Sequence, residues 1–335
     1  MTLMLILCFA LLLFFPAACL EGARNGLLLW FHTVLPTLFP FLFVSSMLVA
    51  TGTAHTISRI GKPFLAPVFR VSTDCCYAIL IGLVSGYPLG AKTCADLVQE
   101  GSISKQEGQY LLCFCNNASP MFIISFTAGS LLGLPYRSCL LFWLTVLVSA
   151  FFTGAIYRFC KHPFTKHPIL KNKLNDAAKD TTEQQEQKYP LRAASIYTNA
   201  KPAEYAIPSA SPLEYALETA IQTITKVGGY IILFGILGYL LTSLALPFPL
   251  LQGCLAGILE ITTGSSALAA LPLAPTLKTV LICAVTAFGG LSSILQTKSV
   301  LGSSGLSVTT YVYTKLLHAA LAAMLSGILL SINVL

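Results

Sequence analysis

The sequence predicts an all-α protein that crosses a membrane several times, and its composition, its segment lengths and an internal duplication support this fold class. Of the 335 residues, 55% are hydrophobic and only 10% are charged, and the mean hydropathy is +0.76. Soluble domains carry about a quarter charged residues. The net charge of +7 does not indicate a nucleic-acid partner, because the basic residues lie in loops between apolar segments and form no basic face. We therefore expect a lipid bilayer around this chain.

Seven apolar segments are long enough to span a bilayer, which takes about 20 residues. They are residues 2–20, 27–51, 109–133, 138–159, 219–245, 277–297 and 309–333. No basic residue precedes the first segment, so the start of a signal peptide is missing. We expect this segment to remain in the protein as an N-terminal transmembrane helix within residues 1–24.

Two further apolar stretches, residues 73–100 and 250–274, carry turn-forming residues in their middle. We expect each to form a re-entrant helical hairpin, which enters the membrane and returns on the same side. At the first tip, Gly86 and Gly90 permit left-handed backbone and Pro88 cannot continue a helix. Irregular backbone at membrane depth is tolerated only where protein or a water-filled cavity surrounds it. The hairpins therefore predict an internal site.

A polar segment, residues 161–216, separates two halves that look alike. The hairpin tips, "GLVSGYPLG" and "GILEITTGS", lie at nearly the same place in each half, and "FCNNASP" and "AFGGLSS" each interrupt an apolar helix. We expect repeats at residues 25–160 and 217–335. With three crossings per repeat, the second enters from the opposite side. Such inverted repeats are typical of secondary transporters, which bind substrate near the midplane where broken helices meet.

The placement of basic residues predicts the orientation. If the first hairpin does not cross the membrane, Arg59, Lys62 and Arg70 fall on the same side as the polar linker. The opposite side then has little beyond Arg24 and Arg137 in its short loops. Because cytoplasmic loops carry an excess of Lys and Arg, the linker is expected to be cytoplasmic.

Two ionisable residues stand out near the hairpin tips. Lys92 and the free N–H groups at the start of the second arm would favour an anionic group, although Lys92 could instead pair with Asp96 one turn on. Glu260, in the first arm of the second hairpin, would hold a coupling ion, a proton or substrate, or be a packing acid neutralised by a proton or a lysine. The full set of expected substrate-binding residues is Gly86, Tyr87, Pro88, Gly90, Lys92, Asn116, Asn117, Ser119, Glu260, Thr262, Thr263, Ser265, Ser266, Gly289, Gly290, Ser292, Ser293 and Gln296.

Other functional classes have weak support. The eleven cysteines and five histidines form no cluster with metal-ligand spacing, and no nucleotide-binding fingerprint is present, so neither a metal nor a cofactor is expected. "GSSG", residues 302–305, with His318 on the next segment, matches a short pattern of intramembrane serine proteases. A four-residue match in a chain rich in Gly and Ser carries little weight, and we expect no enzyme.

Three stretches resemble a known family: "LEGARNGLLLWFHTVLPTLFPF" (20–41), "GLVSGYPLGAK" (82–92) and "FCNNASPMFI" (114–123). They are similar to the YlbJ-type sporulation integral membrane proteins of endospore-forming bacteria, which carry the nucleoside recognition or Gate domain. The resemblance implies a bacterial cell-membrane protein needed to form spores, with a transporter-like core. It does not imply nucleosides as the substrate. The second half departs from the first, since "TTGSS" and "FGGLSS" replace "GYPLG" and "NNASP".

Two functions follow as hypotheses. The first is a transporter or channel for a small polar solute or ion, which binds between the repeats. The second is a membrane scaffold in spore-envelope assembly that keeps this fold and transports nothing. Small-residue faces on several helices would serve either a homodimer or internal packing.

Overall fold

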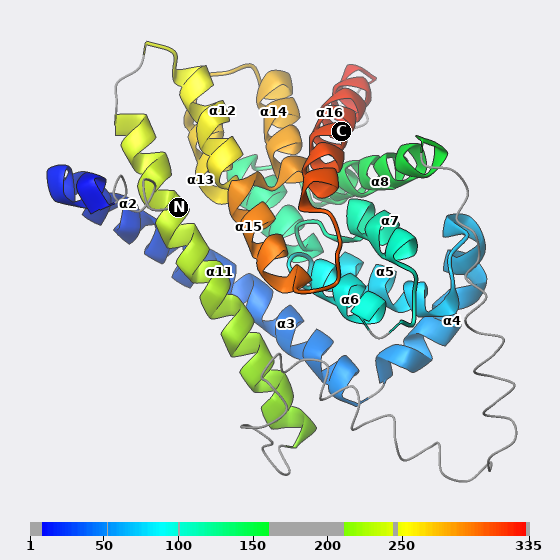
Figure 1. The fold of residues 1–335 in the computed structure, drawn as a ribbon. Coiled ribbons are helices and arrows are strands. Elements are labelled where there is room, and N and C mark those ends of the chain that lie inside the picture. The colour runs from blue at the N-terminus through cyan, green and yellow to red at the C-terminus, as the bar shows by residue number, and fades with distance from the viewer. Residues whose placement is uncertain (1–8, 52, 100, 161–210, 244–246, 333–335) are drawn as a thin grey trace, which may run out of the picture.

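The fold is helical throughout the residues that the computed structural model describes, which are 9–51, 53–99, 101–160, 211–243 and 247–332 (Figure 1). Four helices in these ranges are long and apolar enough to cross a membrane, or up to six if each of two bent helix pairs is one span. The prediction of an all-α protein with several apolar spans is confirmed. Residues 161–210 of the expected linker lie outside the described residues, and helix α11 (Pro212–Ser243) already begins within the expected linker range.

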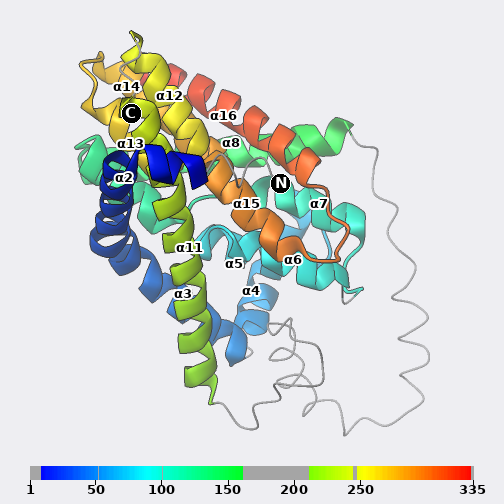
Figure 2. The ribbon, with the colours of Figure 1, turned by 60° about the vertical axis from the view of Figure 1, so that its left-hand side comes forward.

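The N-terminal part is one bent helical run: α2 (Pro16–Leu29), the π-helix η1 (Trp30–Val34) and α3 (Leu35–Ala50). The sequence predicts a first helix that ends by residue 24, but α2 continues through this position without a break. The run bends by 55° further along, between Pro16–Val34 and Leu38–Leu48. Helix α11 packs along α2 and α3 (Figures 1 and 2). Gly22 allows this approach, since a Cβ there would lie 2.8 Å from the Cα of Ile236.

The first half continues with a helical hairpin and a broken helix. Helix α4 (Thr53–Phe69) precedes the hairpin of α5 (Thr73–Ser85) and α6 (Leu89–Gln99). Helix α7 (Lys105–Cys115) ends before a non-helical stretch at residues 116–119, and the π-helix η2 (Phe122–Leu131) follows it. Helix α8 (Tyr136–Cys160) completes the half. Hairpin and break lie where the sequence predicts them.

The second half has the same order of elements after α11. The hairpin consists of α12 (Pro249–Leu259) and α13 (Ile261–Ala270). Helices α14 (Pro275–Phe288) and α15 (Gly290–Leu301) form the broken helix, with Gly289 in left-handed conformation between them, and α16 (Val308–Ser331) ends the half. Figure 1 shows the α12–α13 hairpin at the top and the α5–α6 hairpin below it, with α15 leading down toward α6.

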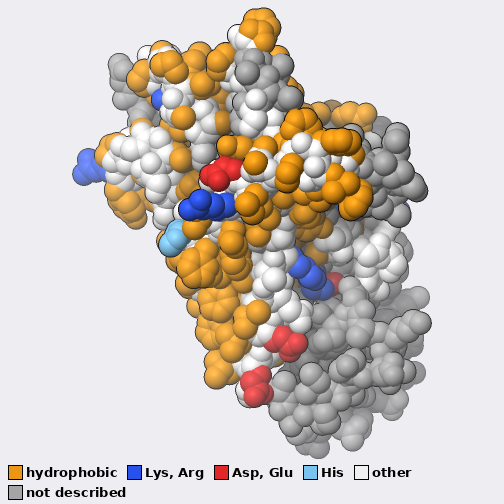
Figure 3. All heavy atoms as spheres, turned by 90° about the vertical axis from the view of Figure 1, so that its left-hand side faces the viewer, with side chains coloured by type: hydrophobic (Ala, Val, Ile, Leu, Met, Phe, Trp, Pro, Cys, Tyr) orange, Lys and Arg blue, Asp and Glu red, His pale blue; other side chains and the backbone are white. Residues whose placement is uncertain are grey.

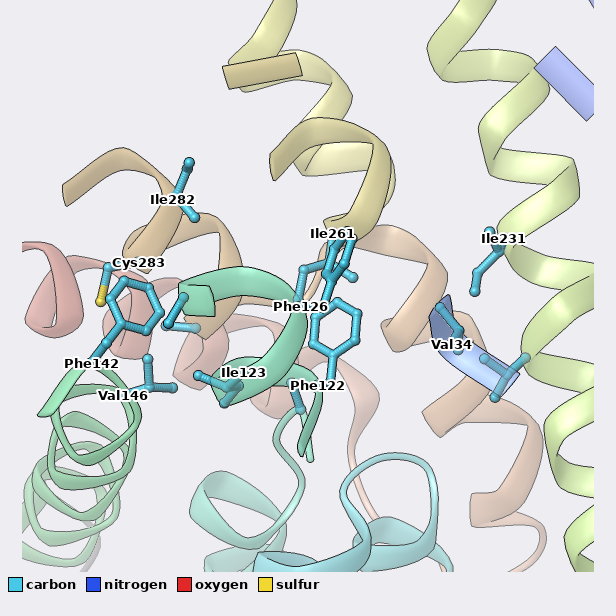
Figure 4. Packing of buried hydrophobic residues seen from close by; sticks show 14 of the residues in the cluster. Val34, Phe122, Ile123, Phe126, Phe142, Val146, Ile231, Ile261, Ile282 and Cys283 are labelled. Carbon is cyan, nitrogen blue, oxygen red and sulfur yellow. The ribbon is translucent and has the colours of Figure 1, made fainter. Parts of the chain in front are cut away.

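Apolar side chains fill the interior and also cover much of the outside. Inside, Phe142 and Val146 of α8 point toward Ile282 and Cys283 of α14 (Figure 4). Outside, Figure 3 shows hydrophobic side chains spread over the face on which α2 and α11 lie, with few charged groups among them. Exposed large hydrophobic residues on these two helices include Leu20, Leu27, Leu217, Ile221 and Leu233. Such a surface suits contact with lipid chains rather than water.

The close contact of α12 with α13 leads to a testable prediction. A Cβ on Gly264 would overlap the Cα and backbone nitrogen of Gly257, and backbone atoms cannot move aside as a side chain can. We expect Gly264→Ala to destabilise the protein by about 3 kcal/mol, measured as a loss of thermal stability in detergent. Gly229→Ala on α11 is the matched control, because nothing lies within 4 Å of a Cβ there. Equal stability of both variants would show that the hairpin arms are not in this contact.

Candidate functional site

A cavity lies at the centre of the molecule, where both hairpin tips and both helix breaks meet. The cavity has a volume of about 30 Å³ in this conformation, which leaves room for about two water molecules. Tyr87 and Ser119 line it from the first half, and Glu260 and Gly289 from the second. The helices η1 and α11 close a further side through Val34 and Ile231.

The first tip is fixed to the first helix break by close backbone contacts. The backbone N–H of Tyr87 donates to the carbonyl of Asn117 at 2.7 Å. Gly86 has a φ of 76°, and a Cβ there would lie 2.6 Å from the backbone nitrogen of Ser119. Gly82 and Gly90 both lie against the carbonyl of Cys115, where neither has room for a Cβ. The glycines of this tip are therefore required both by the turn and by the neighbouring break.

Glu260 forms the second tip. The sequence predicts it within the first arm, whereas the structure places it between α12 and α13 in extended conformation, as the N-cap of α13. Its side-chain atom Oε2 accepts hydrogen bonds from the backbone N–H of Thr263 at 2.8 Å, from the hydroxyl of Thr263 at 3.1 Å and from the hydroxyl of Thr262. A Cβ on Gly290 would lie 3.1 Å from the Cα of Glu260, so the second break packs directly against the second tip.

Asn116 joins the two halves. Its side-chain amide donates to the hydroxyls of Thr297 on α15 at 2.8 Å and Tyr311 on α16 at 2.9 Å. Its side-chain carbonyl accepts from the backbone N–H of Ala91 at 3.2 Å. That bond caps the start of α6, where the sequence predicts free N–H groups for an anion. Asn116 is thus a buried structural link rather than a cavity-lining group.

Lys315 is a buried polar residue that the sequence reasoning missed. It is 1% exposed on α16, and its Nζ donates to Asn117 Oδ1 at 3.2 Å and contacts His318 Nδ1 at 3.3 Å. His318 Nε2 lies 2.9 Å from the carbonyl of Val146. Because a carbonyl only accepts, we assign the ring proton to Nε2, and Nδ1 accepts from Lys315. An ionisable residue inside an apolar segment is the signal that drew attention to Glu260, and it could have identified Lys315.

The expected site residues divide into three groups. Eight of them line the cavity: Tyr87, Ser119, Glu260, Thr262, Gly289, Ser292, Ser293 and Gln296. Nine stand in or beside the tips and breaks without lining it: Gly86, Pro88, Gly90, Asn116, Asn117, Thr263, Ser265, Ser266 and Gly290. Lys92 instead pairs with Asp96, at 3.2 Å between Nζ and Oδ2, which is the alternative that the sequence left open.

The cavity has an apolar wall and a polar wall. Val34, Phe122, Ile231 and Ile261 make up much of the apolar wall, and Figure 4 shows Phe122 close to Ile261 and Val34 close to Ile231. The polar wall includes Ser85, which the sequence reasoning did not select. A polar wall that faces an apolar wall suits water, a small ion or the polar end of a solute.

Two basic residues of the first half, Arg70 and Arg158, lie together at one end of α8. Arg158, near the C-terminal end of α8, donates from its guanidinium to the carbonyls of Phe69 at 2.6 Å and Arg70 at 3.1 Å. The C-terminal end of α8 therefore lies beside the junction of α4 and α5. Arg137, which the sequence places on the opposite side, lies in the first turn of the same helix.

The fold and its central cavity define a polytopic helical membrane protein with an internal, partly polar site. The chain is 26% identical, over 339 residues, to the sporulation integral membrane protein YlbJ of Bacillus subtilis (strain 168), and the match covers 92% of this chain and 76% of that protein. This similarity confirms the resemblance to YlbJ-type proteins over nearly the whole length. No family model matches the chain, and no solved structure matches it.

Proposed function

We propose that this chain is a cell-membrane protein of sporulation that binds a small polar solute in the central cavity and passes it across the bilayer. The observation that carries the proposal is the position of the cavity, at the meeting point of two hairpin tips and two helix breaks. At a tip or a break, backbone N–H and C=O groups lack the hydrogen bonds that a continuous helix would give them. Membrane transporters bind substrates and ions at such places. The sporulation role is taken from the name of the Bacillus subtilis relative.

The two halves would act as inverted repeats of the Gate type. Each half contributes a hairpin, a broken helix and a long helix in the same order. Tyr87 of the first tip and Glu260 of the second both reach the cavity, while the bodies of the two hairpins lie above and below one another in Figure 1. Rocking of one repeat against the other would open the cavity to each side in turn.

The same proposal includes the orientation and the lack of a catalytic step. The linker would be cytoplasmic, because the end of α8 lies beside Arg70 and basic residues favour that side. The cavity would bind and release its solute unchanged. His318 supports this assignment, since its hydrogen-bond partners are Lys315 and the backbone of Val146 and Ala287. The Ser304 hydroxyl instead accepts from the backbone N–H of Leu306.

The proposal is tested by thermal unfolding of the purified protein in detergent with a panel of nucleosides, small carboxylates and other small anions. A solute present at 100 times its dissociation constant should stabilise the folded state by about 2.7 kcal/mol. The shift should disappear when Ser292, a cavity residue on α15, is replaced by Phe. Failure of every solute to shift the transition, with Ser292→Phe still supporting spore formation, would favour the scaffold hypothesis instead.

A further inference from the structure

Glu260 is a buried carboxylate that lines the cavity. Its hydrogen-bond partners are the hydroxyls and backbone N–H groups of Thr262 and Thr263, at the start of α13. Glu260 is only 2% exposed. The ion pair that the described residues form is Lys92–Asp96, so no basic residue among them neutralises this carboxylate. A buried carboxylate without a counter-charge is costly.

Two oxygens in the same cavity wall lack partners. Among the described residues, the side-chain atoms Gln296 Oε1 and Ser85 Oγ are buried and form no hydrogen bond. Gln296 is held in place from its other end, since its Nε2 donates to the Ser292 hydroxyl at 3.2 Å. That bond leaves the carbonyl end of the amide as a free acceptor. Buried polar atoms are nearly always satisfied, so two such oxygens beside the buried Glu260 carboxylate indicate a missing ligand.

We propose that the polar end of the cavity binds an alkali-metal cation, with the Glu260 carboxylate, Gln296 Oε1 and Ser85 Oγ as ligands. The three groups come from the second tip, the second broken helix and the end of the first hairpin arm, so the cation would hold both halves together. Carboxylate, amide and hydroxyl oxygens are the ligands of hard cations.

The charge of the site selects a monovalent ion. One carboxylate with neutral amide and hydroxyl oxygens balances a single positive charge, whereas protein sites for calcium gather several carboxylates. Within the described residues, no group of three or more His, Cys, Asp or Glu side chains could hold a metal, which counts against a transition metal. A proton shared between Glu260 and Gln296 does not fit either, because their oxygens form no hydrogen bond with each other.

This inference rests on the proposed function, because the cation would be the ion whose gradient drives transport of the solute. Binding of the cation would fix Glu260 and Gln296 beside the apolar wall, and so complete the solute site. The solute should therefore bind more weakly when the cation is absent.

The test is thermal unfolding of the purified full-length protein at fixed pH and ionic strength, with choline chloride replaced stepwise by lithium, sodium or potassium chloride. At least one alkali chloride should raise the unfolding temperature by about 3 °C or more over choline. Glu260→Gln and Gln296→Leu should lose this rise. Ser326→Ala is the matched control, because Ser326 is buried on α16, bonds within its own helix and does not line the cavity.

A smaller change at the site keeps the test valid if Glu260→Gln or Gln296→Leu fails to fold. Ser85→Ala removes one ligand and should move the salt dependence to concentrations about tenfold higher, without changing the unfolding temperature in choline. Equal unfolding temperatures in all four salts would overturn the inference, and so would a rise with calcium or magnesium alone, or with acid alone. If solutes still stabilise the protein in choline chloride while alkali salts do not, the cation site is wrong and the proposed solute site stands.

Discussion

Replacing Glu260 by glutamine should abolish the contribution of this chain to spore formation while leaving it folded. Glutamine has nearly the same shape and retains an oxygen for the Thr263 N–H and hydroxyl, so the cap of α13 survives. The charge that faces the cavity is lost. Because hydrogen bonds to charged groups are worth about 1.5–3 kcal/mol, affinity for a bound cation or polar solute should fall about 10- to 100-fold.

The measurement is the count of heat-resistant spores in Bacillus subtilis that lacks YlbJ and carries this chain, after the parent chain has been shown to restore the count. Lys92→Gln is the matched control, because its pair with Asp96 lies outside the cavity and a partly exposed i,i+4 pair contributes little. A full spore count with Glu260→Gln, at the parental protein level, would remove Glu260 from the mechanism.

Replacing Asn116 by alanine should have the largest effect on stability of any single polar substitution in this region. It removes three buried hydrogen bonds, which join the Asn116 side chain to the Ala91 N–H, the Thr297 hydroxyl and the Tyr311 hydroxyl. At roughly 1 kcal/mol for each hydrogen bond lost, the loss should be about 3 kcal/mol. The link between the two halves is lost as well, so the halves should separate more easily.

The loss is measured by thermal unfolding and by unfolding in increasing concentrations of a denaturing detergent. Tyr311→Phe is the reference variant, because it removes a single hydroxyl from the same cluster. It should lower the free energy of unfolding by about 1 kcal/mol. An Asn116→Ala protein as stable as the Tyr311→Phe protein would show that Asn116 does not join the halves in this way.

The hairpins and breaks could be predicted from the sequence because local chemistry specifies them. Single prolines are tolerated inside helices of this chain, as at Pro40 in α3, but a cluster of glycine, proline or polar residues interrupts an apolar helix, so "GYPLG" and "NNASP" mark the first tip and the first break. The sequence predicts the second tip a little too far along the chain. The hydroxyl-rich residues 262–266 resemble a turn, yet they continue as helix α13 once the Glu260 carboxylate caps its start.

The contacts between the halves could not be predicted in this way. Asn116, Asn117 and Lys315 are far apart in the sequence, and nothing local says that the amide of Asn117 accepts from Lys315. The role of Asn116 as a link also depends on Tyr311, almost two hundred residues away. Ser85 was missed because a serine at the end of an apolar helix carries no signal until the opposite wall is known.

The most direct test of a transport cavity is the accessibility of residue 292 from each side of the membrane. Ser292→Cys places a thiol in the buried polar wall, and Ser326→Cys places one in a buried packing contact of α16 as the control. Both proteins are treated with a small membrane-impermeant thiol reagent in right-side-out and in inside-out vesicles, and modification is located by mass spectrometry. We expect Cys at position 292 to react from both sides and Cys at position 326 from neither. Reaction at position 292 from neither side would contradict a transport cavity and leave the scaffold hypothesis.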